Sequence, residues 1–186
     1  MVKHFYTVIT ATASILTLPL AKKQLRLEQD FTDEDDLIQT YIDAAQEDRE
    51  LYINRKIKEQ NLILEADAFA PSITFERNYE NDVIESVVYY PLGEDALVML
   101  DASQYKLRKS NVTECFEIIF LSMPETVKRD DAVIITVKQG FSLETCPKTI
   151  MQAMKLRLAD FYERREDRDV GNSSAANALV RAFRKY

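Results

Sequence analysis

One stretch decides the fold class: Val133-Ile134-Ile135-Thr136-Val137, a run of β-branched residues that is almost entirely apolar. β-branched side chains favour extended backbone. A short apolar run without polar alternation is typical of a strand that neighbours cover on both sides. We therefore predict that residues 133–137 form the central strand of a sheet.

Shorter runs of β-branched and aromatic residues surround this stretch between residues 56 and 140. They lie at 62–64, 73–75, 83–90, 96–100, 105–107 and 116–121. Asn, Asp, Gly or Pro separates most of them, as expected for turns between strands. This zone predicts a small mixed or antiparallel sheet.

The residues before this zone, 17–55, have helical spacing. The first short helix has Thr17 as a candidate cap and Pro19 in its first turn. We predict that a second helix begins near Thr32, where Thr32 and Asp35 form a pair similar to a capping box. Acidic residues crowd the first turn of this helix, where they meet the positive end of the helix dipole.

The second helix carries two adjacent apolar stripes, and we expect this broad face to be core. One stripe consists of Leu37, Tyr41, Ala44 and Leu51, and the other of Ile38, Ile42, Ala45 and Tyr52. The helices at 32–55 and 147–166 thus carry more apolar positions than one core-facing stripe needs. The excess predicts self-association through the helix flanks.

Helical spacing returns at residues 147–186. Pro147 lies at a first-turn position, and Ile150, Met154, Leu158 and Phe161 follow at helical intervals. Gly171 to Ser174 breaks the pattern, and a short last helix, Ala175 to Phe183, is predicted after the break. The fold class is therefore α+β, with a helical bundle core of N- and C-terminal helices and an inserted small β-sheet region.

We expect one domain over residues 1–186. Its predicted parts are an extended arm (1–16), helices (17–55), the inserted β region (56–140), a core helix (147–170) and a C-terminal docking segment (171–186). The N-terminus loosely resembles a signal peptide, but its apolar stretch is too short and too rich in Thr. We interpret it as a strand or arm, so we expect cytoplasmic synthesis and reduced cysteines.

Composition excludes several classes. The formal net charge is −7, from 24 Lys and Arg against 31 Asp and Glu, and the pI is near 4.9. An autonomous nucleic-acid binder would need a basic footprint instead. No apolar run approaches the ~20 residues of a transmembrane helix, so we expect no membrane partner.

The residues with possible chemistry do not form a catalytic or metal-binding pattern. His4 is the single histidine, and Cys115 and Cys146 are far apart, so no paired zinc spacing exists. The acidic run from Asp30 to Asp36 lacks the Gly and the closing Glu of a calcium loop. The three glycines are too scattered for a phosphate cradle. We predict no catalytic, cofactor-binding or metal-binding residues and no enzymatic activity.

The order of the motifs resembles the head–tail connector (adaptor or head-completion) proteins of long-tailed bacteriophages and prophages. An opening arm leads into Ala21-Lys22-Lys23-Gln24-Leu25-Arg26, and an acidic-capped helix follows at 33–45. The sheet resembles the family's at 86–90 and 105–107, and its strand at 133–141 ends in an aromatic after Gly140. The stretches 146–153 and 160–166 resemble its most recognisable helix, and 178–184 its closing segment.

This resemblance implies a structural virion protein at the head–tail junction, made in the host bacterial cytoplasm and without a cofactor. It implies a ring of about a dozen copies beneath the portal. The implied partners are other copies, the portal and a tail-completion or stopper protein, with DNA as non-specific cargo. An acidic chain suits such a channel, because a lumen that neutralised phosphates would hold DNA.

Two other classes stay open. The first is a small α+β enzyme or regulator with an unrecognised site, which a pocket with convergent polar groups would favour. The second is a secreted or periplasmic binding module, which a cleaved N-terminus would favour.

The last sixteen residues suggest a docking segment for the portal. Their apolar stripe needs a partner surface, and the segment carries three basic residues and no acidic residue. The predicted contact residues are Leu179, Val180, Arg181, Phe183, Arg184 and Lys185. The alternative is that the stripe, with Ala176, folds back onto the core of its own subunit.

Overall fold

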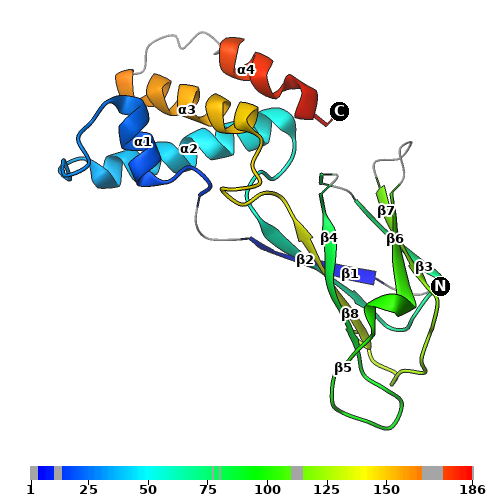
Figure 1. The fold of residues 1–186 in the computed structure, drawn as a ribbon. Helices are drawn as coiled ribbons and strands as arrows, with labels where there is room; N and C mark the ends of the chain where they lie inside the picture. Colours follow the sequence, from blue (N-terminus) through cyan, green and yellow to red (C-terminus); the bar gives the residue numbers. More distant parts are fainter. Residues whose placement is uncertain are drawn as a thin grey trace. The chain divides into compact units, whose positions relative to one another are not determined.

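The computed structural model describes residues 4–10, 14–76, 78–79, 81–109, 115–164 and 174–185, and the chain divides into two compact units (Figure 1). The β unit comprises Met1–Ala11 and Glu59–Gly140, and the helical unit comprises Thr12–Lys58 and Phe141–Tyr186. Residues 59–140 of the β unit are inserted in sequence between helices, and its first part precedes them. The predicted α+β class is therefore confirmed.

The β unit contains two antiparallel sheets, ordered β1-β2-β8-β4-β5 and β3-β7-β6. Its strands are β1 His4–Thr10, β2 Gln60–Ala66, β3 Ser72–Glu76, β4 Val83–Tyr89, β5 Val98–Met99, β6 Tyr105–Lys109, β7 Cys115–Phe120 and β8 Val133–Gln139, and a 3₁₀ helix, η1 Ala102–Gln104, precedes β6. Of the two arrangements that the sequence left open, the antiparallel one holds.

The predicted central strand is confirmed in β8. It pairs with β2 on one side and β4 on the other, so Ile135 lies opposite Leu64 and Val87. Val133, Ile135 and Val137 are fully buried on one face of the strand. A strand bonded on both edges exposes no backbone polar groups, which is why the most apolar run occupies this place.

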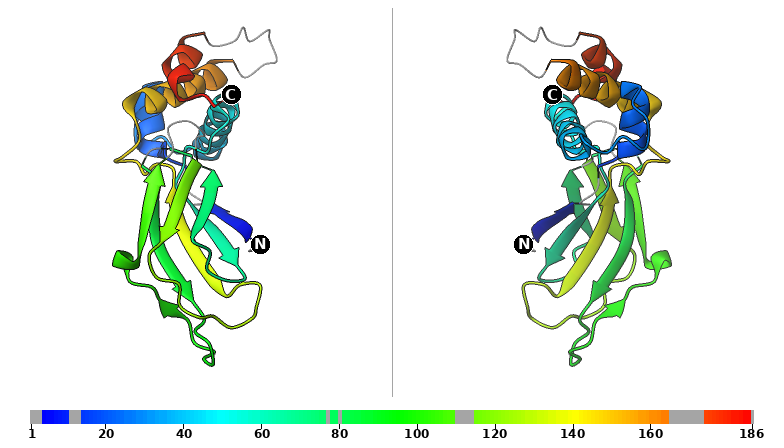
Figure 2. Two further views of the ribbon diagram at one scale, coloured as in Figure 1. Left: turned by 90° about the vertical axis from the view of Figure 1, so that its right-hand side faces the viewer. Right: turned by 90° about the vertical axis from the view of Figure 1, so that its left-hand side faces the viewer.

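The two sheets share one core (Figure 2). The alternate residues Phe116, Ile118 and Phe120 of β7 are buried with the inward side chains of β8. Each buried side chain of this size contributes about 1.5–3 kcal/mol of transfer free energy. The edge-to-face pair of Phe69 and Phe120 extends this core.

The helical unit contains α1 Leu18–Leu25, α2 Asp35–Ile53, α3 Lys148–Glu163 and α4 Ser174–Val180, followed by the 3₁₀ helix η2 Arg181–Phe183. The predicted last helix thus appears as α4 with η2. Residues 165–170, the end of the predicted core helix, lie outside the described residues. Helix α2 packs on α1 and α3, and α3 packs on α4.

The predicted start of the second helix is wrong by three residues. Helix α2 begins at Asp35, with Glu34 as the N-cap and without a side-chain cap hydrogen bond. The backbone N–H of Asp35 instead donates to the carbonyl of Thr32 in a turn, 3.1 Å away. Asp35 forms an ion pair of 2.6 Å with the buried Lys22 of α1, so the acidic first turn serves packing as well as the dipole.

The end of α2 is fixed by a left-handed residue and a buried carboxylate. Asn54 has φ 53°, a conformation that Asn tolerates better than most residues. Glu50 accepts hydrogen bonds from the backbone N–H of Ile57 at 3.0 Å and from the ammonium of Lys56 at 2.9 Å. These bonds hold the chain where it leaves the helix.

Only one of the two apolar stripes of α2 is core. Ile38, Ile42 and Ala45 are completely buried, whereas Leu51 of the other stripe is 82% exposed. The expectation that the whole broad face is buried is therefore wrong. The second stripe is covered only in part: Tyr41 stacks on Phe161 of α3 with ring centres 6.3 Å apart, whereas Leu51 at its end is exposed. None of the described helices is long and apolar enough to cross a membrane.

Candidate assembly surface

Four of the six residues predicted to dock lie in α4 and η2, and the other two, Arg184 and Lys185, follow η2 directly; this segment packs within the helical unit. Their exposure differs strongly. Arg181 and Arg184 are exposed, Leu179, Phe183 and Lys185 are half-buried, and Val180 is completely buried. The basic side chains therefore form the outer side of the segment.

The expected free apolar stripe needs a correction. Ala176 and Val180 have no exposed surface, because they pack into the helical unit itself. For these two residues the fold-back alternative holds. A helix this short is unstable alone in water, so packing against α3 stabilises it. Docking to a portal stays a prediction. Within the predicted set, the buried Val180 packs into the helical unit and holds the segment in place.

A buried polar contact ties α4 to α2. The Arg49 guanidinium donates a hydrogen bond to the side-chain oxygen of Asn177, 2.6 Å away. Both residues are less than one-tenth exposed. A buried charge is tolerated only when hydrogen-bond partners replace water, so this contact fixes the position of the two helices relative to each other.

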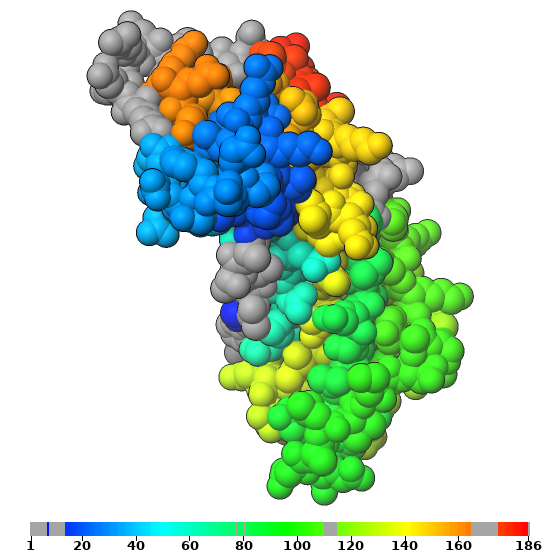
Figure 3. All heavy atoms as spheres, turned by 60° about the vertical axis from the view of Figure 1, so that its left-hand side comes forward, coloured from blue at the N-terminus to red at the C-terminus, as the bar shows by residue number. Residues whose placement is uncertain are grey.

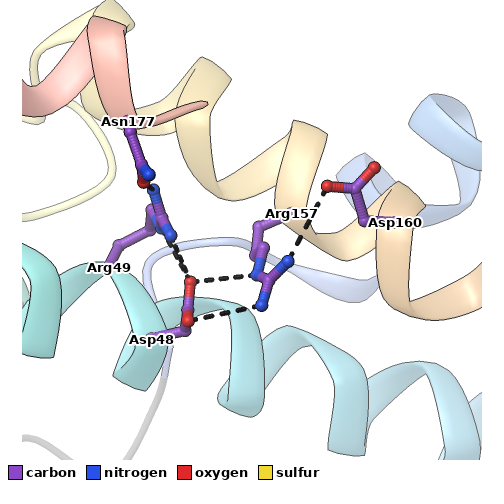
Figure 4. A network of polar contacts seen from close by, with 5 residues as sticks. All are labelled: Asp48, Arg49, Arg157, Asp160 and Asn177. Carbon is purple, nitrogen blue, oxygen red and sulfur yellow. Dashed lines mark hydrogen bonds and ion pairs between the residues drawn. The ribbon is translucent and has the colours of Figure 1, made fainter. Parts of the chain in front are cut away.

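The contact belongs to a larger network (Figure 4). Asp48, next along α2, accepts hydrogen bonds from Arg49 and from the Nε of Arg157 on α3, the latter at 3.0 Å. Arg157 also lies 3.9 Å from the carboxylate of Asp160. The network therefore connects α2, α3 and α4 in one set of charge-assisted bonds.

The end of the segment is anchored to the last turn of α2. The backbone N–H of Lys185 donates to the carbonyl of Ile53 at 2.9 Å, which satisfies an acceptor that the helix end leaves open. The guanidinium of Arg184 lies 5.2 Å from the ring centre of Tyr52, and that of Arg49 lies 5.3 Å from it. Cation–π contacts thus hold the exposed Arg184 beside Tyr52.

We use the name C-terminal face for Tyr52, Arg181 and Arg184. These residues combine a half-buried tyrosine and two exposed arginines on one preformed support. Aromatic residues and arginine carry much of the binding energy in protein interfaces. The arrangement suits contact with another protein surface.

Sequence reasoning missed the residues that build this support, namely Asp48, Arg49, Arg157 and Asn177. One signal was present: Asn177 lies three residues before Val180, so a polar side chain occupies the apolar side of the last helix. A polar residue at such a position needs a buried partner. The identity of the partner could not be read from the sequence.

Charge is distributed unevenly between the units. The β unit holds 8 Lys and Arg against 15 Asp and Glu, which accounts for the whole net charge of −7. The helical unit holds 16 of each sign and is neutral overall. Its C-terminal face is therefore a locally basic surface on a neutral unit.

The residues considered for chemistry do not come together. Neither Cys115 nor Cys146 forms a disulfide, and burial raises the pKa of the Cys146 thiol to about 11, which makes it a poor nucleophile. The backbone of His4 lies in β1 opposite Ala66, and its side chain falls outside the described part. Within the described ranges no cluster of His, Cys, Asp and Glu could hold a metal ion.

Solved structures share this fold over almost the whole chain. The neck of an empty GTA particle computed with C6 symmetry contains a chain that is 21% identical, with a TM-score of 0.67, and the match covers 97% of this chain and 96% of that one. A chain from the virion of a native gene transfer agent particle is 19% identical over the same shares, with a TM-score of 0.64. A third chain, from the neck of a native GTA particle computed with C12 symmetry, is 19% identical over the same shares, with a TM-score of 0.62.

No curated protein matches the sequence. A family profile does match it: the family described as phage gp6-like head-tail connector protein aligns with residues 15–115. That range spans more than half of the chain, including α1, α2 and most of the β unit. The match agrees with the resemblance in the order of the motifs and with the prediction that the protein is not an enzyme. The chain belongs to the phage gp6-like head-tail connector family of structural proteins.

Proposed function

We propose that this protein is a neck component of a phage or phage-like particle that joins head to tail at the head–tail junction. It forms a ring of about a dozen copies beneath the portal, bridges the portal to a tail-completion protein and lets DNA pass. The single observation that carries this proposal is the family match over residues 15–115.

Two observations support a ring. The similar chains come from particles computed with C6 and C12 symmetry. The second stripe of α2 ends in Leu51, which is 82% exposed. A cyclic ring needs a heterologous contact between two different faces of the subunit, and an apolar helix flank supplies one of them.

The C-terminal face, together with the predicted docking residues beside it, is the proposed portal contact. Arg181 and Arg184 point to solvent, Leu179 and Phe183 are half-buried beside them, and Lys185 is anchored to α2. Preformed docking residues reduce the entropy lost on binding. The matching surface of the portal is expected to be acidic, because complementary charges speed and orient association.

The excess of acidic over basic residues supports DNA passage. All of the net negative charge belongs to the β unit. Phosphates gain affinity for a protein when its Lys and Arg release condensed counterions. A ring without an excess of such residues therefore exerts little grip on DNA that moves through it.

Native mass spectrometry and negative-stain imaging of the full chain, alone and with its portal, test the proposal. We expect rings, at least when portal is present. Leu51→Asp should abolish them, whereas Leu143→Asp, which changes an exposed leucine of the same unit outside the helices, should leave them intact. A chain that stays monomeric at high concentration with portal present would overturn the proposal.

A further inference from the structure

An exposed apolar tip lies at one end of the β unit. Nine large hydrophobic residues are exposed within the described ranges, and six of them lie in two loops or in the short strand β5 that ends the first loop. Met99 is 69% exposed and Leu92 is 61% exposed. We define the tip by its six members: Leu92, Leu97, Val98, Met99, Leu121 and Met123. Isolated apolar residues on a surface are ordinary, but such a concentration marks an interaction site.

The two loops are held side by side by backbone bonds. The N–H of Leu92 donates to the carbonyl of Glu125, and the N–H of Val127 donates to the carbonyl of Tyr90, both at 3.1 Å. The guanidinium of Arg129 lies 3.9 Å from the ring centre of Tyr90, which braces the same junction. The tip is therefore a preformed surface, and Figure 3 shows its first loop, in green, at the surface.

The tip includes a short sheet edge that carries no charged side chain. Strand β5 is the outermost strand of its sheet, and its only two residues, Val98 and Met99, are both exposed apolar residues that follow the exposed Leu97. The edge strand β6 of the other sheet carries Lys106, Arg108 and Lys109. Charges of that kind prevent pairing with foreign strands. Their absence from β5 leaves that edge open to a further strand.

The surroundings of the tip are acidic. Exposed carboxylates lie within and directly after its two loops: Glu94, Asp95, Asp101, Glu125 and Asp130. The exposed basic residues of this region are Lys128 and Arg129, and Arg129 forms an ion pair with Asp131. An acidic rim repels an anionic membrane and other acidic surfaces. It attracts a partner with Lys or Arg beside its apolar side chains.

We propose that the tip binds an extended segment of a different neck protein, which adds a strand to β5 and alternates apolar side chains with Lys or Arg. Strand addition supplies backbone hydrogen bonds, and alternate side chains reach the apolar tip on one side and the acidic rim on the other. The inference rests on the proposed function, because it places the partner in the neck.

Site-specific photo-crosslinking in assembled particles tests the proposal. A benzophenone amino acid replaces Met99 in one variant and Thr74, an exposed residue of the edge strand β3, in the control. We expect an adduct with a different protein from position 99 and none from position 74. Mass spectrometry of the adduct should locate a segment with alternating apolar and basic residues.

The other outcomes are decisive. An adduct between two copies of this chain, or no adduct from position 99 in particles that contain the chain, overturns the inference alone. Particles that lack the chain overturn the proposed function, and the inference with it.

A pair of substitutions gives a second measurement. Val98→Lys gives β5 a positive charge like those on the edge strand β6, which disfavours pairing with a further strand. The charge also repels a basic partner. The yield of tailed particles should therefore fall about tenfold or more. Thr74→Lys adds the same charge to another edge strand and should leave the yield unchanged. Equal yields from both variants, in subunits that melt like the parent, would contradict strand addition at β5.

Discussion

The guanidinium of Arg49 and the side-chain oxygen of Asn177 lie 2.6 Å apart in the buried region between α2 and α4. This contact joins residues that are 128 positions apart in the chain. It shows that the last helix is part of the folded helical unit. The segment with the predicted docking residues is therefore positioned by the unit before any partner arrives.

Removal of Asn177 should destabilise the subunit. Asn177→Ala leaves the buried Arg49 without this acceptor, which costs about 1–3 kcal/mol of unfolding free energy. Asn177→Asp keeps an oxygen for Arg49 and should retain most of the stability. Urea denaturation of the three proteins measures the difference. An unchanged midpoint for Asn177→Ala would mean that another group replaces the contact.

Truncation after Val170 should also destabilise the subunit, by about 3–5 kcal/mol, because it removes the buried Ala176 and Val180 and the contact to Arg49. Truncation after Lys185 keeps all of these and is the control. Thermal melting measures both. A subunit that melts like its parent after the longer truncation would show that α4 adds nothing to the core.

Charge reversal tests portal docking without loss of the fold. Arg181→Glu changes an exposed residue of the C-terminal face, and we expect about tenfold weaker binding to portal. Arg164→Glu makes the same change at the exposed end of α3 and should bind like the parent. Surface plasmon resonance with immobilised portal gives both affinities. Equal weakening by the two variants would point to net charge rather than to a specific contact.

The two thiols and the histidine should be dispensable for assembly. With a pKa of about 11, Cys146 is only ~0.1% thiolate at pH 8, so iodoacetamide should modify it far more slowly in the native than in the unfolded protein. Substitution of His4, Cys115 and Cys146 together, by Ala or Ser, should preserve ring formation at a modest cost in stability. Loss of rings in a folded His4→Ala variant would reveal a role for the N-terminal strand.

Asp82 should make the β unit more stable as the pH falls. Burial raises the pKa of this carboxyl above its ordinary value, against hydrogen bonds from the backbone of Asn78 and Tyr79 and from Gln139 that lower it. The folded state therefore binds the proton more tightly than the unfolded state does. This group's contribution to stability increases as the pH falls through the raised pKa towards about 3.8.

A comparison with Asp82→Asn isolates that effect. The variant cannot titrate at this position, so the stability of the parent relative to the variant should be lowest at neutral pH and should rise on acidification. Denaturation curves between pH 7 and pH 4 measure the difference. A difference that falls on acidification would mean that the hydrogen bonds outweigh burial.

The sequence by itself determined the order and type of the main elements. The apolar run 133–137 predicted the central strand, because β-branched residues favour extended backbone and a run without polar residues fits a strand that is paired on both edges. Helical spacing around Ile38 and Ile150 predicted α2 and α3, and the order of the motifs indicated the connector family. These features depend on local periodicity and composition, which a sequence displays directly.

Only the tertiary structure decided what covers each apolar surface. Periodicity showed that α4 has an apolar stripe. The sequence pattern of such a stripe is the same whether a partner or its own subunit covers it. The structure buries Ala176 and Val180 internally and leaves Leu51 of α2 and Met99 of β5 exposed. It also brings Arg49 to Asn177 across the chain. Such contacts depend on how distant elements pack, and packing is a property of the whole chain rather than of any local pattern.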